Sequence, residues 1–248
     1  MTPEQFFKKN PSVAVAFSGG VDSAYLLYVS KKLGAQTKAY YVKTPFQPQF
    51  EYDDAVRLAK QLDIPMTTLF LDVLQDEKIV SNPQNRCYFC KQKIFSAILE
   101  QAKQDGFSLV VDGTNASDDA SDRPGMQALL ELQVRSPLRE CGLTKNEIRR
   151  LSKEANLFTH DKPAYACLAT RIPTGTPITA ELLQKTERSE ELLKELGFSD
   201  FRVRIIGDRA KIQLKESQLP LLLQHRTAVL SALKNDYKEV LLDLEVRK

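Results

Sequence analysis

The segment that most constrains the fold of this chain is the apolar run Val13–Phe17, followed directly by Ser-Gly-Gly-Val-Asp-Ser at 18–23. Five consecutive apolar residues are typical of a buried parallel strand, and the apolar-rich stretch 24–29 predicts a helix. A glycine turn between a strand and a helix points the free N–H groups and the positive dipole end of the helix at one spot. The segment therefore predicts a site for an anion such as phosphate.

The residues of this turn indicate which anion it binds. Gly19 and Gly20 allow the backbone to approach a phosphate closely and to adopt positive φ, and Ser18 and Ser23 add hydroxyl donors. Asp22 would repel a bare phosphate, so its presence indicates that Mg²⁺ bridges the carboxylate and the phosphate. The chain contains no GxxxxGK[ST] motif, so this turn is not a kinase-type P-loop. SGGVDS instead resembles the phosphate-binding loop of the ATP pyrophosphatases, a resemblance that implies an ATP site.

Strands and helices alternate over the first part of the 248-residue chain. We expect strands over 36–42, 66–71 and 108–111, a short strand at Val134, and helices over 51–62, 88–103 and 144–156. Such alternation is typical of an α/β fold with a doubly wound parallel sheet, in which ligands bind beyond the carboxyl ends of the strands. The 18–23 turn lies there. A second predicted ATP-binding turn follows the fourth strand and consists of Asp112, Gly113, Thr114 and Asn115.

The pattern changes after an irregular, proline-containing stretch at 158–179. We expect a helix over 180–196, an antiparallel hairpin of strands 201–206 and 210–214 turning at Gly207-Asp208, a helix over 216–233 and a last strand over 239–246. This organisation predicts an ATP-binding domain over 1–160, an active-site connection over 161–179 and a smaller α+β domain over 180–248 for substrate binding or oligomerisation.

The sequence has four cysteines, Cys87, Cys90, Cys141 and Cys167. The first two form a CxxC pair at the start of a predicted helix, a position that suits metal binding or redox chemistry. Cys167 lies in the irregular stretch and joins the pair if that stretch folds over the mouth of the ATP site. Three alternatives follow: zinc with His160 or His225 as fourth ligand, a [4Fe–4S] cluster with one iron open to sulfide or substrate, or no shared ligand. Cys141 is expected to be a small buried residue.

Composition places limits on partners and location. With 42% apolar and 27% charged residues, the chain is typical of a globular protein. Its net charge of +3 gives little support for a large nucleic-acid surface. No apolar run approaches the ~20 residues of a membrane span, and the N-terminus lacks the apolar core of a signal peptide. We therefore expect a cytoplasmic protein.

Six motifs together resemble one family: SGGVDS at 18–23, CYFCK at 87–91, DGTN at 112–115, DRPG at 122–125, RSPL at 135–138 and CLATR-P-GT at 167–176. Over nearly its whole length the chain resembles the LarE family of ATP-dependent sulfur transferases, in the PP-loop ATP pyrophosphatase superfamily. The resemblance implies a homo-oligomer that uses ATP and Mg²⁺ to adenylate a carboxylate of pyridinium-3,5-biscarboxylic acid mononucleotide. Sulfur then replaces AMP, in the biosynthesis of the nickel-pincer cofactor.

Members of this family take the sulfur either from a sacrificed cysteine or from a [4Fe–4S] cluster held by three cysteines. Cys167 matches the active-site cysteine, and Cys87 and Cys90 supply the other two, so the resemblance implies the cluster type. It also implies that Cys167, Asp22 and Arg171 carry the catalysis. A guanidinium fork fits both phosphate and carboxylate groups. Candidate ligands for those groups of the substrate are Arg123, Arg171, Arg202 and Arg204.

Other functions fit the same motifs. A tRNA-thiolating enzyme also combines this turn with three cluster-binding cysteines. An amide-forming ATP pyrophosphatase would use the turn with no need for Cys167. A non-enzymatic nucleotide sensor would bind ATP and release no pyrophosphate.

Overall fold

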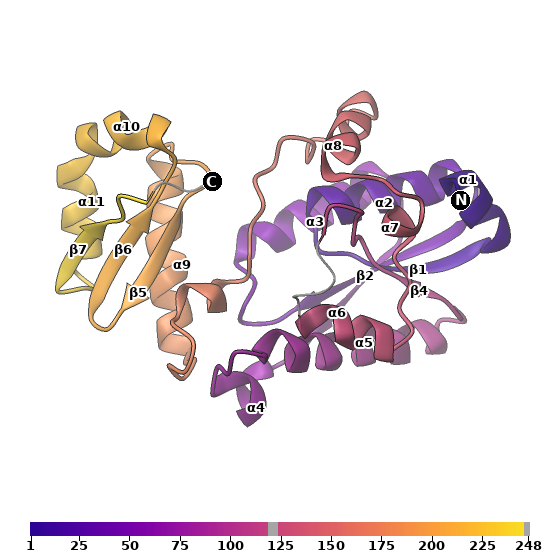
Figure 1. Ribbon diagram of the computed structural model, residues 1–248, viewed down its shortest axis with the longest axis horizontal. Helices are drawn as coiled ribbons and strands as arrows, with labels where there is room; N and C mark the ends of the chain where they lie inside the picture. Colours follow the sequence, from indigo (N-terminus) through magenta and orange to yellow (C-terminus); the bar gives the residue numbers. More distant parts are fainter. Residues whose placement is uncertain (119–123, 246–248) are drawn as a thin grey trace. The chain divides into compact units, whose positions relative to one another are not determined.

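The computed structural model describes residues 1–118 and 124–245 (Figure 1). They form two compact units, each with its own sheet. The first unit comprises Met1–Val73 and Asn85–Lys162, and the second comprises Leu74–Gln84 and Pro163–Lys248. The short segment Leu74–Gln84 thus belongs to the second unit, although it lies in the sequence between the two parts of the first.

The sheet of the first unit is parallel throughout, with strand order β3-β2-β1-β4. Its strands are β1 (Ser12–Ala16), β2 (Gln36–Lys43), β3 (Met66–Phe70) and β4 (Val110–Val111). The predicted short strand at Val134 is reduced to a single parallel bridge between Val111 and Arg135. The predicted α/β fold with a parallel sheet is confirmed.

Helices cover both faces of this sheet (Figure 1). They are α1 (Pro3–Lys9), α2 (Val21–Lys32), α3 (Gln49–Gln61), α5 (Arg86–Gln104), α6 (Pro124–Glu131), α7 (Pro137–Glu140) and α8 (Lys145–Glu154). Val13 and Val15 of β1 pack in one apolar cluster with residues of α2, α3 and α8, whereas Ala14 packs in a second cluster with α5 and α6. Successive side chains of a strand point to opposite faces, so a strand covered on both sides has to be apolar at every position.

The helix α2 starts at Val21, three residues earlier than its apolar pattern indicates. Val21 is buried in the cluster with α3 and α8, so tertiary packing extends the helix into the turn. Asp22 and Ser23 consequently lie in the first helical turn. Gly20 is the N-cap and offers no side chain to the free N–H groups, which leaves them available to a ligand.

The second unit has a mixed sheet with strand order β5-β6-β7. The predicted hairpin is confirmed: β5 (Arg202–Ile206) and β6 (Arg209–Gln213) are antiparallel, and Gly207 at their turn has a φ of 60°. The last strand, β7 (Glu239–Leu242), is parallel to β6 and shorter than expected; residue 246 of the predicted strand lies outside the described residues. The long helix α9 (Ala180–Glu195) packs against β5.

The segment 216–233 is helical as predicted, but it does not form one continuous helix. The segment is divided into the 3-10 turn η3 (Glu216–Gln218) and the helices α10 (Leu219–Gln224) and α11 (Arg226–Leu233). Pro220 lies in the first turn of α10, where its missing N–H does no harm, but inside a continuous helix it would remove a hydrogen bond. No helix among the described residues has both the length and the apolar character that crossing a membrane requires.

Asn82 joins the early segment of the second unit to the later one. This segment contains the end of the 3-10 turn η1 (Val73–Gln75) and the helix α4 (Glu77–Val80). The Asn82 side-chain amide donates to the carbonyl oxygens of Pro173 and Thr176, at 2.8 and 3.0 Å, and its own carbonyl accepts from the Gly175 N–H at 2.8 Å. Asn82 is buried, with a φ of 55° that asparagine tolerates better than most residues.

Replacement of Asn82 should destabilise the second unit. Asn82→Ala removes two buried hydrogen bonds, about 1 kcal/mol each, and places a Cβ-bearing residue without a polar side chain at positive φ, about 1 kcal/mol more. Asn82→Gly loses the same bonds without the backbone strain. Urea unfolding should therefore rank the proteins as wild type, Asn82→Gly and Asn82→Ala in falling stability. Equal midpoints for wild type and Asn82→Ala would contradict this assignment.

Candidate active site

A cavity of about 330 Å³ opens in the first unit, beyond the carboxyl ends of β1 and β4. The residues of the two predicted ATP-binding turns that line it are Ser18, Gly20, Asp22, Ser23, Asp112, Gly113 and Thr114. Gly19 and Asn115 belong to the same turns but do not line it. The structure thus brings together two turns that are about ninety residues apart in the sequence, as the parallel-sheet argument predicts.

The 18–23 turn is organised mainly by Ser23. Its Oγ accepts from the Ser18 N–H at 3.2 Å, lies 3.1 Å from Ser18 Oγ, and donates to the Gly20 carbonyl at 3.2 Å. Gly19 has a φ of 75°, but Gly20 has a φ of −79°. Only Gly19 therefore uses the freedom to adopt positive φ, because Gly20 is the N-cap and has the extended backbone of that position.

The two turns touch at Gly113. A Cβ atom at this position would lie 2.7 Å from the Ser23 nitrogen and 2.9 Å from the Ser23 Cα. Only a residue without a side chain allows the turn after β4 to reach the first turn of α2. This contact sets one wall of the cavity.

Asp112 and Asn115 have structural roles in the second turn. The Asp112 carboxylate is buried and accepts from Thr114 Oγ1 at 2.5 Å and from Ser136 Oγ at 2.6 Å. Asn115 Oδ1 accepts from the Ser117 N–H at 2.8 Å. These bonds hold the turn in shape, and Asp112, Gly113 and Thr114 are its members that line the cavity.

The two carboxylate oxygens of Asp22 differ in their environment. Its Oδ2 accepts from Lys145 Nζ at 2.5 Å, whereas its Oδ1 is buried without a hydrogen-bond partner. Burial raises the pKa of this carboxyl above its ordinary value, although Lys145 acts in the opposite direction. A buried carboxylate oxygen that lacks a partner is costly unless something else binds it.

Sequence reasoning missed two lysines at this site. Lys91 and Phe95 of α5 line the cavity, so the helix that starts with the CxxC pair also contributes a cation to it. Lys145 comes from the first position of α8. The CYFCK motif and the capping box at Thr144 were recognisable from the sequence, but whether a lysine reaches this site depends on which loop its helix packs against.

Gly113→Ala should lower the affinity for ATP, the predicted ligand. The new Cβ forces the second turn away from Ser23, and a displacement of about 1 Å in a binding group costs on the order of 100-fold. Isothermal titration calorimetry with Mg·ATP measures the effect. Gly34→Ala is the control: Gly34 has a φ of 78° and open space around it, so the substitution introduces backbone strain far from the cavity and should leave affinity unchanged. Unchanged binding by Gly113→Ala would contradict the steric argument.

None of the four cysteines forms a disulfide in the structure. Cys87 is exposed and Cys90 half-buried, both near the start of α5 in the first unit, whereas the half-buried Cys167 belongs to the second unit. Among the described residues, no three His, Cys, Asp or Glu side chains are assembled as a metal site. The grouping of the three cysteines therefore stays a prediction. Cys141 is half-buried and packs at the edge of the core of the first unit.

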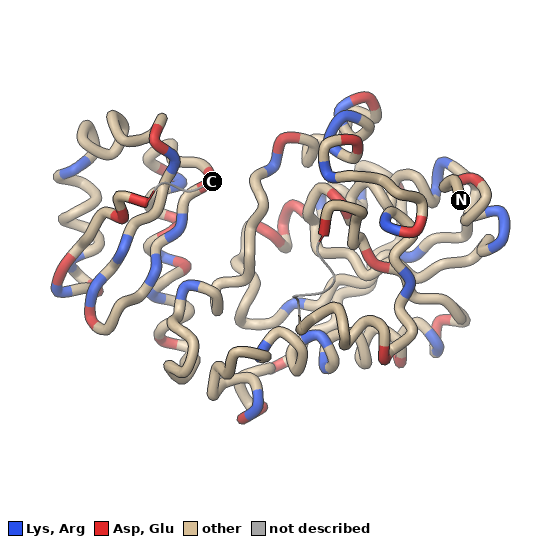
Figure 2. The backbone as a smooth tube through the Cα atoms, viewed as in Figure 1, with Lys and Arg blue, Asp and Glu red and all other residues tan. Residues whose placement is uncertain are grey.

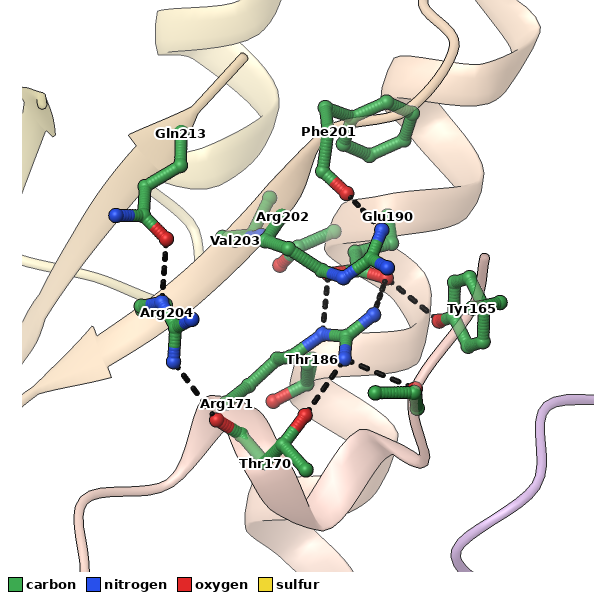
Figure 3. A network of polar contacts seen from close by, with 12 residues as sticks. Tyr165, Thr170, Arg171, Thr186, Glu190, Phe201, Arg202, Val203, Arg204 and Gln213 are labelled. Carbon is green, nitrogen blue, oxygen red and sulfur yellow. Dashed lines mark hydrogen bonds and ion pairs between the residues drawn. The ribbon is translucent and has the colours of Figure 1, made fainter. Parts of the chain in front are cut away.

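The segment around Cys167 is held by three arginines of the second unit (Figure 3). Arg171 donates to the carbonyl oxygens of Ala166 and Cys167, at 2.9 and 3.4 Å. Arg202 donates to the Ala164 carbonyl at 2.5 Å, and Arg204 donates to the Thr170 carbonyl at 3.0 Å. Arg204 also donates to the Gln213 side chain. The guanidinium groups thus fix the backbone on both sides of Cys167, which precedes the 3-10 turn η2 (Leu168–Arg171).

Glu190 of α9 is the centre of this network, and sequence reasoning missed it. Its carboxylate accepts from Arg171 Nε at 2.8 Å and from the second terminal nitrogen at 3.0 Å, as a two-pronged ion pair. It also accepts from Tyr165 Oη at 2.6 Å and from the Val203 N–H at 2.9 Å. Burial and the nearby Glu190 charge raise the pKa of Tyr165. Both partners of the ion pair are almost fully buried, with side chains 1% and 5% exposed.

The burial of these arginines limits the contacts with substrate that the sequence predicts for them. Arg171 and Arg202 are 1% and 4% exposed, with donors committed to the protein, while Arg204 is half-buried. Figure 2 shows further basic positions along the β5–β6 hairpin, where Arg209 and Lys211 pair with Glu239 and Asp243. Arg123 lies outside the described residues.

Glu190→Gln should strongly destabilise the second unit. The substitution leaves the buried Arg171 charge without a counter-ion, and breaking a buried pair in this way costs about 3–5 kcal/mol. The matched control is Glu239→Gln, which breaks the exposed pair with Arg209 and should change stability by less than about 1 kcal/mol. Urea unfolding of both variants measures the difference. Equal effects would show that the buried pair contributes no more than the exposed one.

Comparisons with known proteins give a consistent group of relatives. Residues 11–133 match the model of the tRNA methyl transferase HUP domain family. An uncharacterized protein of Synechocystis is 36% identical over 221 residues, which is 89% of this chain and 82% of that protein. The pyridinium-3,5-bisthiocarboxylic acid mononucleotide synthase of Lactiplantibacillus plantarum is 32% identical over 209 residues, 84% of this chain and 76% of that enzyme. A tRNA-specific 2-thiouridylase of Clostridium perfringens is 29% identical over 189 residues, which is 60% of this chain and 52% of that enzyme.

Proposed function

The chain belongs to the LarE family of ATP-dependent sulfur transferases, and from this membership we propose that it converts a substrate carboxylate into a thiocarboxylate in nickel-pincer cofactor biosynthesis. ATP first adenylates the carboxylate in the first unit, with release of pyrophosphate, and sulfur then displaces AMP. The proposed substrate is pyridinium-3,5-biscarboxylic acid mononucleotide, because the Lactiplantibacillus relative is named for the bisthiocarboxylic product. The observation that carries the proposal is the unpartnered, buried Asp22 Oδ1 beside the free N-terminus of α2.

The cavity of the first unit suits a Mg²⁺-bound nucleotide. The first-turn N–H groups of α2 offer donors to phosphate oxygens, and Lys91 adds a cation. Oxygen ligands are what Mg²⁺ prefers, and the free Asp22 Oδ1 fits this role. When bound, Mg²⁺ supplies charge that stabilises the phosphates as pyrophosphate leaves. The volume of about 330 Å³ is within the range of small-molecule sites, about 300–1,000 Å³.

Adenylation is the step that makes sulfur transfer feasible. A carboxylate is a poor electrophile because its leaving group would be an oxide, whereas an acyl adenylate releases AMP. Donors fixed before the reaction stabilise the charge that develops on the phosphate oxygens without having to reorient. In the first unit such donors are backbone groups held in place by Ser23 and Gly113.

For the sulfur step we propose that Cys167 acts together with Cys87 and Cys90. The donor set fits a [4Fe–4S] cluster with three protein ligands: three thiols, none in a disulfide, two of them three residues apart on one face of α5. Such a cluster, when bound, supplies an iron that can carry a labile sulfide. Arg171 is better suited to positioning Cys167 than to touching substrate, since its guanidinium is buried against Glu190 and two carbonyls.

Thiolation of tRNA is the second candidate. Its support is the similarity to a tRNA-specific 2-thiouridylase and to a family model named for tRNA modification. The match to that model ends at residue 133, inside the first unit, so it does not include the segment around Cys167. This pattern favours a shared way of activating the substrate and not a shared substrate.

The variant Cys167→Ala should separate the two steps. We expect it to release pyrophosphate from ATP in the presence of the pyridinium substrate, because the first unit is intact, and to form no thiocarboxylate. Purified anaerobically, wild type should contain about four irons per chain with absorbance near 400 nm, and Cys167→Ala should lose both. Mass spectrometry of the product and iron analysis are the measurements. Cys141→Ala is the control and should retain both activities and the iron.

Each other result selects a different function. Amide formation from ammonia by Cys167→Ala would indicate an amide-forming ATP pyrophosphatase. Sulfur incorporation into tRNA, with none into the pyridinium substrate, would establish the second candidate. Wild type without iron, whose Cys167 becomes lighter by one H₂S on turnover, would replace the cluster with a sacrificed cysteine.

A further inference from the structure

Lys145 occupies the position at Asp22 where a cation is needed. Its Nζ lies 2.5 Å from Asp22 Oδ2, and the two side chains are 31% and 22% exposed. The other carboxylate oxygen, Oδ1, is buried and has no partner. A lysine that served only to neutralise Asp22 would leave this oxygen unsatisfied permanently, which is a cost that an ion pair on the surface does not carry.

The backbone of Lys145 is fixed next to the cavity. A capping box at Thr144 starts α8, with the Thr144 N–H donating to Glu147 Oε2 at 2.9 Å. The Lys145 N–H donates to Ser117 Oγ at 3.0 Å, and the Ser117 N–H donates to Asn115 Oδ1. Lys145 is therefore tied to the turn after β4, which lines the cavity. Its flexible four-carbon side chain is the only part free to move.

The charges in the cavity disfavour the Lys145–Asp22 ion pair once a nucleotide binds. Three carboxylates and one lysine line the cavity: Asp22, Asp112, Asp118 and Lys91. A triphosphate adds several negative charges and needs more cations than Lys91 provides. A divalent cation on Asp22 would repel the Lys145 ammonium from the same carboxylate. The nearest anion then available to a lysine anchored at the cavity is the phosphate chain.

We propose that Lys145 is a nucleotide-binding residue that holds Asp22 in the nucleotide-free protein and passes to the phosphates of ATP when Mg²⁺ binds Asp22. The inference rests on the proposed function only for the identity of the nucleotide. Lys145 then competes with the metal ion for Asp22 when no nucleotide is bound, and it binds the phosphates when ATP is bound. A lysine that merely clamps α8 to α2 would do neither.

The test uses Mn²⁺ alone and Mg·ATP as separate probes. Electron paramagnetic resonance with Mn²⁺ and no nucleotide should show that Lys145→Met binds the ion about 5- to 150-fold more tightly than wild type, because the competing ammonium is gone. The double variant Asp22→Asn/Lys145→Met should lose that gain. Calorimetry with Mg·ATP should show about tenfold or greater loss of affinity in Lys145→Met, the effect of removing a charged hydrogen bond.

Two further variants control the test. Lys153→Met changes an exposed lysine in the last turn of the same helix and should alter neither measurement. Lys145→Arg keeps a cation beside Asp22 and should exclude Mn²⁺ as wild type does; thermal melts show that each variant is folded. Unchanged Mn²⁺ binding or unchanged Mg·ATP binding in Lys145→Met overturns the proposal. Sulfur transfer is not measured, so a protein that shows the exchange yet transfers no sulfur refutes only the proposed function.

Discussion

The close contact between Gly113 and the first turn of α2 is the constraint on which the candidate nucleotide site depends. Two parallel strands end side by side, but their loops form a cavity only if one loop can lie against the backbone of the other. The missing side chain of Gly113 allows an approach that a Cβ at 2.7 Å from the Ser23 nitrogen would prevent. This contact brings Thr114 to the wall of the cavity, opposite the first turn of α2 with its uncapped N–H groups and the half-buried Asp22.

In the second unit, the main constraint is the fixing of the irregular segment around Cys167. The segment that carries Cys167 has little regular structure, so its carbonyl oxygens need partners from outside. Arg171, Arg202 and Arg204 supply them, and Glu190 neutralises and orients the most buried of the three. Buried ion pairs are poor sources of stability but favour one arrangement over its alternatives. Such specificity is useful where a cysteine has to be presented in one position.

The sequence was sufficient for the parallel sheet, the meeting of its two turns at one cavity and the hairpin at Gly207, because these depend on local patterns: apolar runs, glycine turns and caps. It was insufficient wherever the outcome depends on a partner distant in the chain. The helix expected over 216–233 is broken near Pro220, and Glu190 looked like an ordinary surface residue of an amphipathic helix. Arg171 was recognised as important, but its distance from Glu190, nineteen residues later, could not be inferred.

The charged groups of the two units differ in how fully they are hydrogen-bonded. This difference distinguishes a group suited to bind a ligand from groups that position the backbone. Around Arg171, no buried side-chain nitrogen or oxygen of Arg171, Glu190 or Tyr165 lacks a hydrogen-bond partner. Asp22 differs: its Oδ1 has no hydrogen-bond partner, and its Oδ2 accepts from Lys145, which belongs to a different helix. A buried carboxylate oxygen without a partner carries a desolvation cost that a bound cation would remove. The half-satisfied Asp22 therefore suits a ligand-binding role, whereas the fully bonded Arg171 suits the role of holding the segment around Cys167.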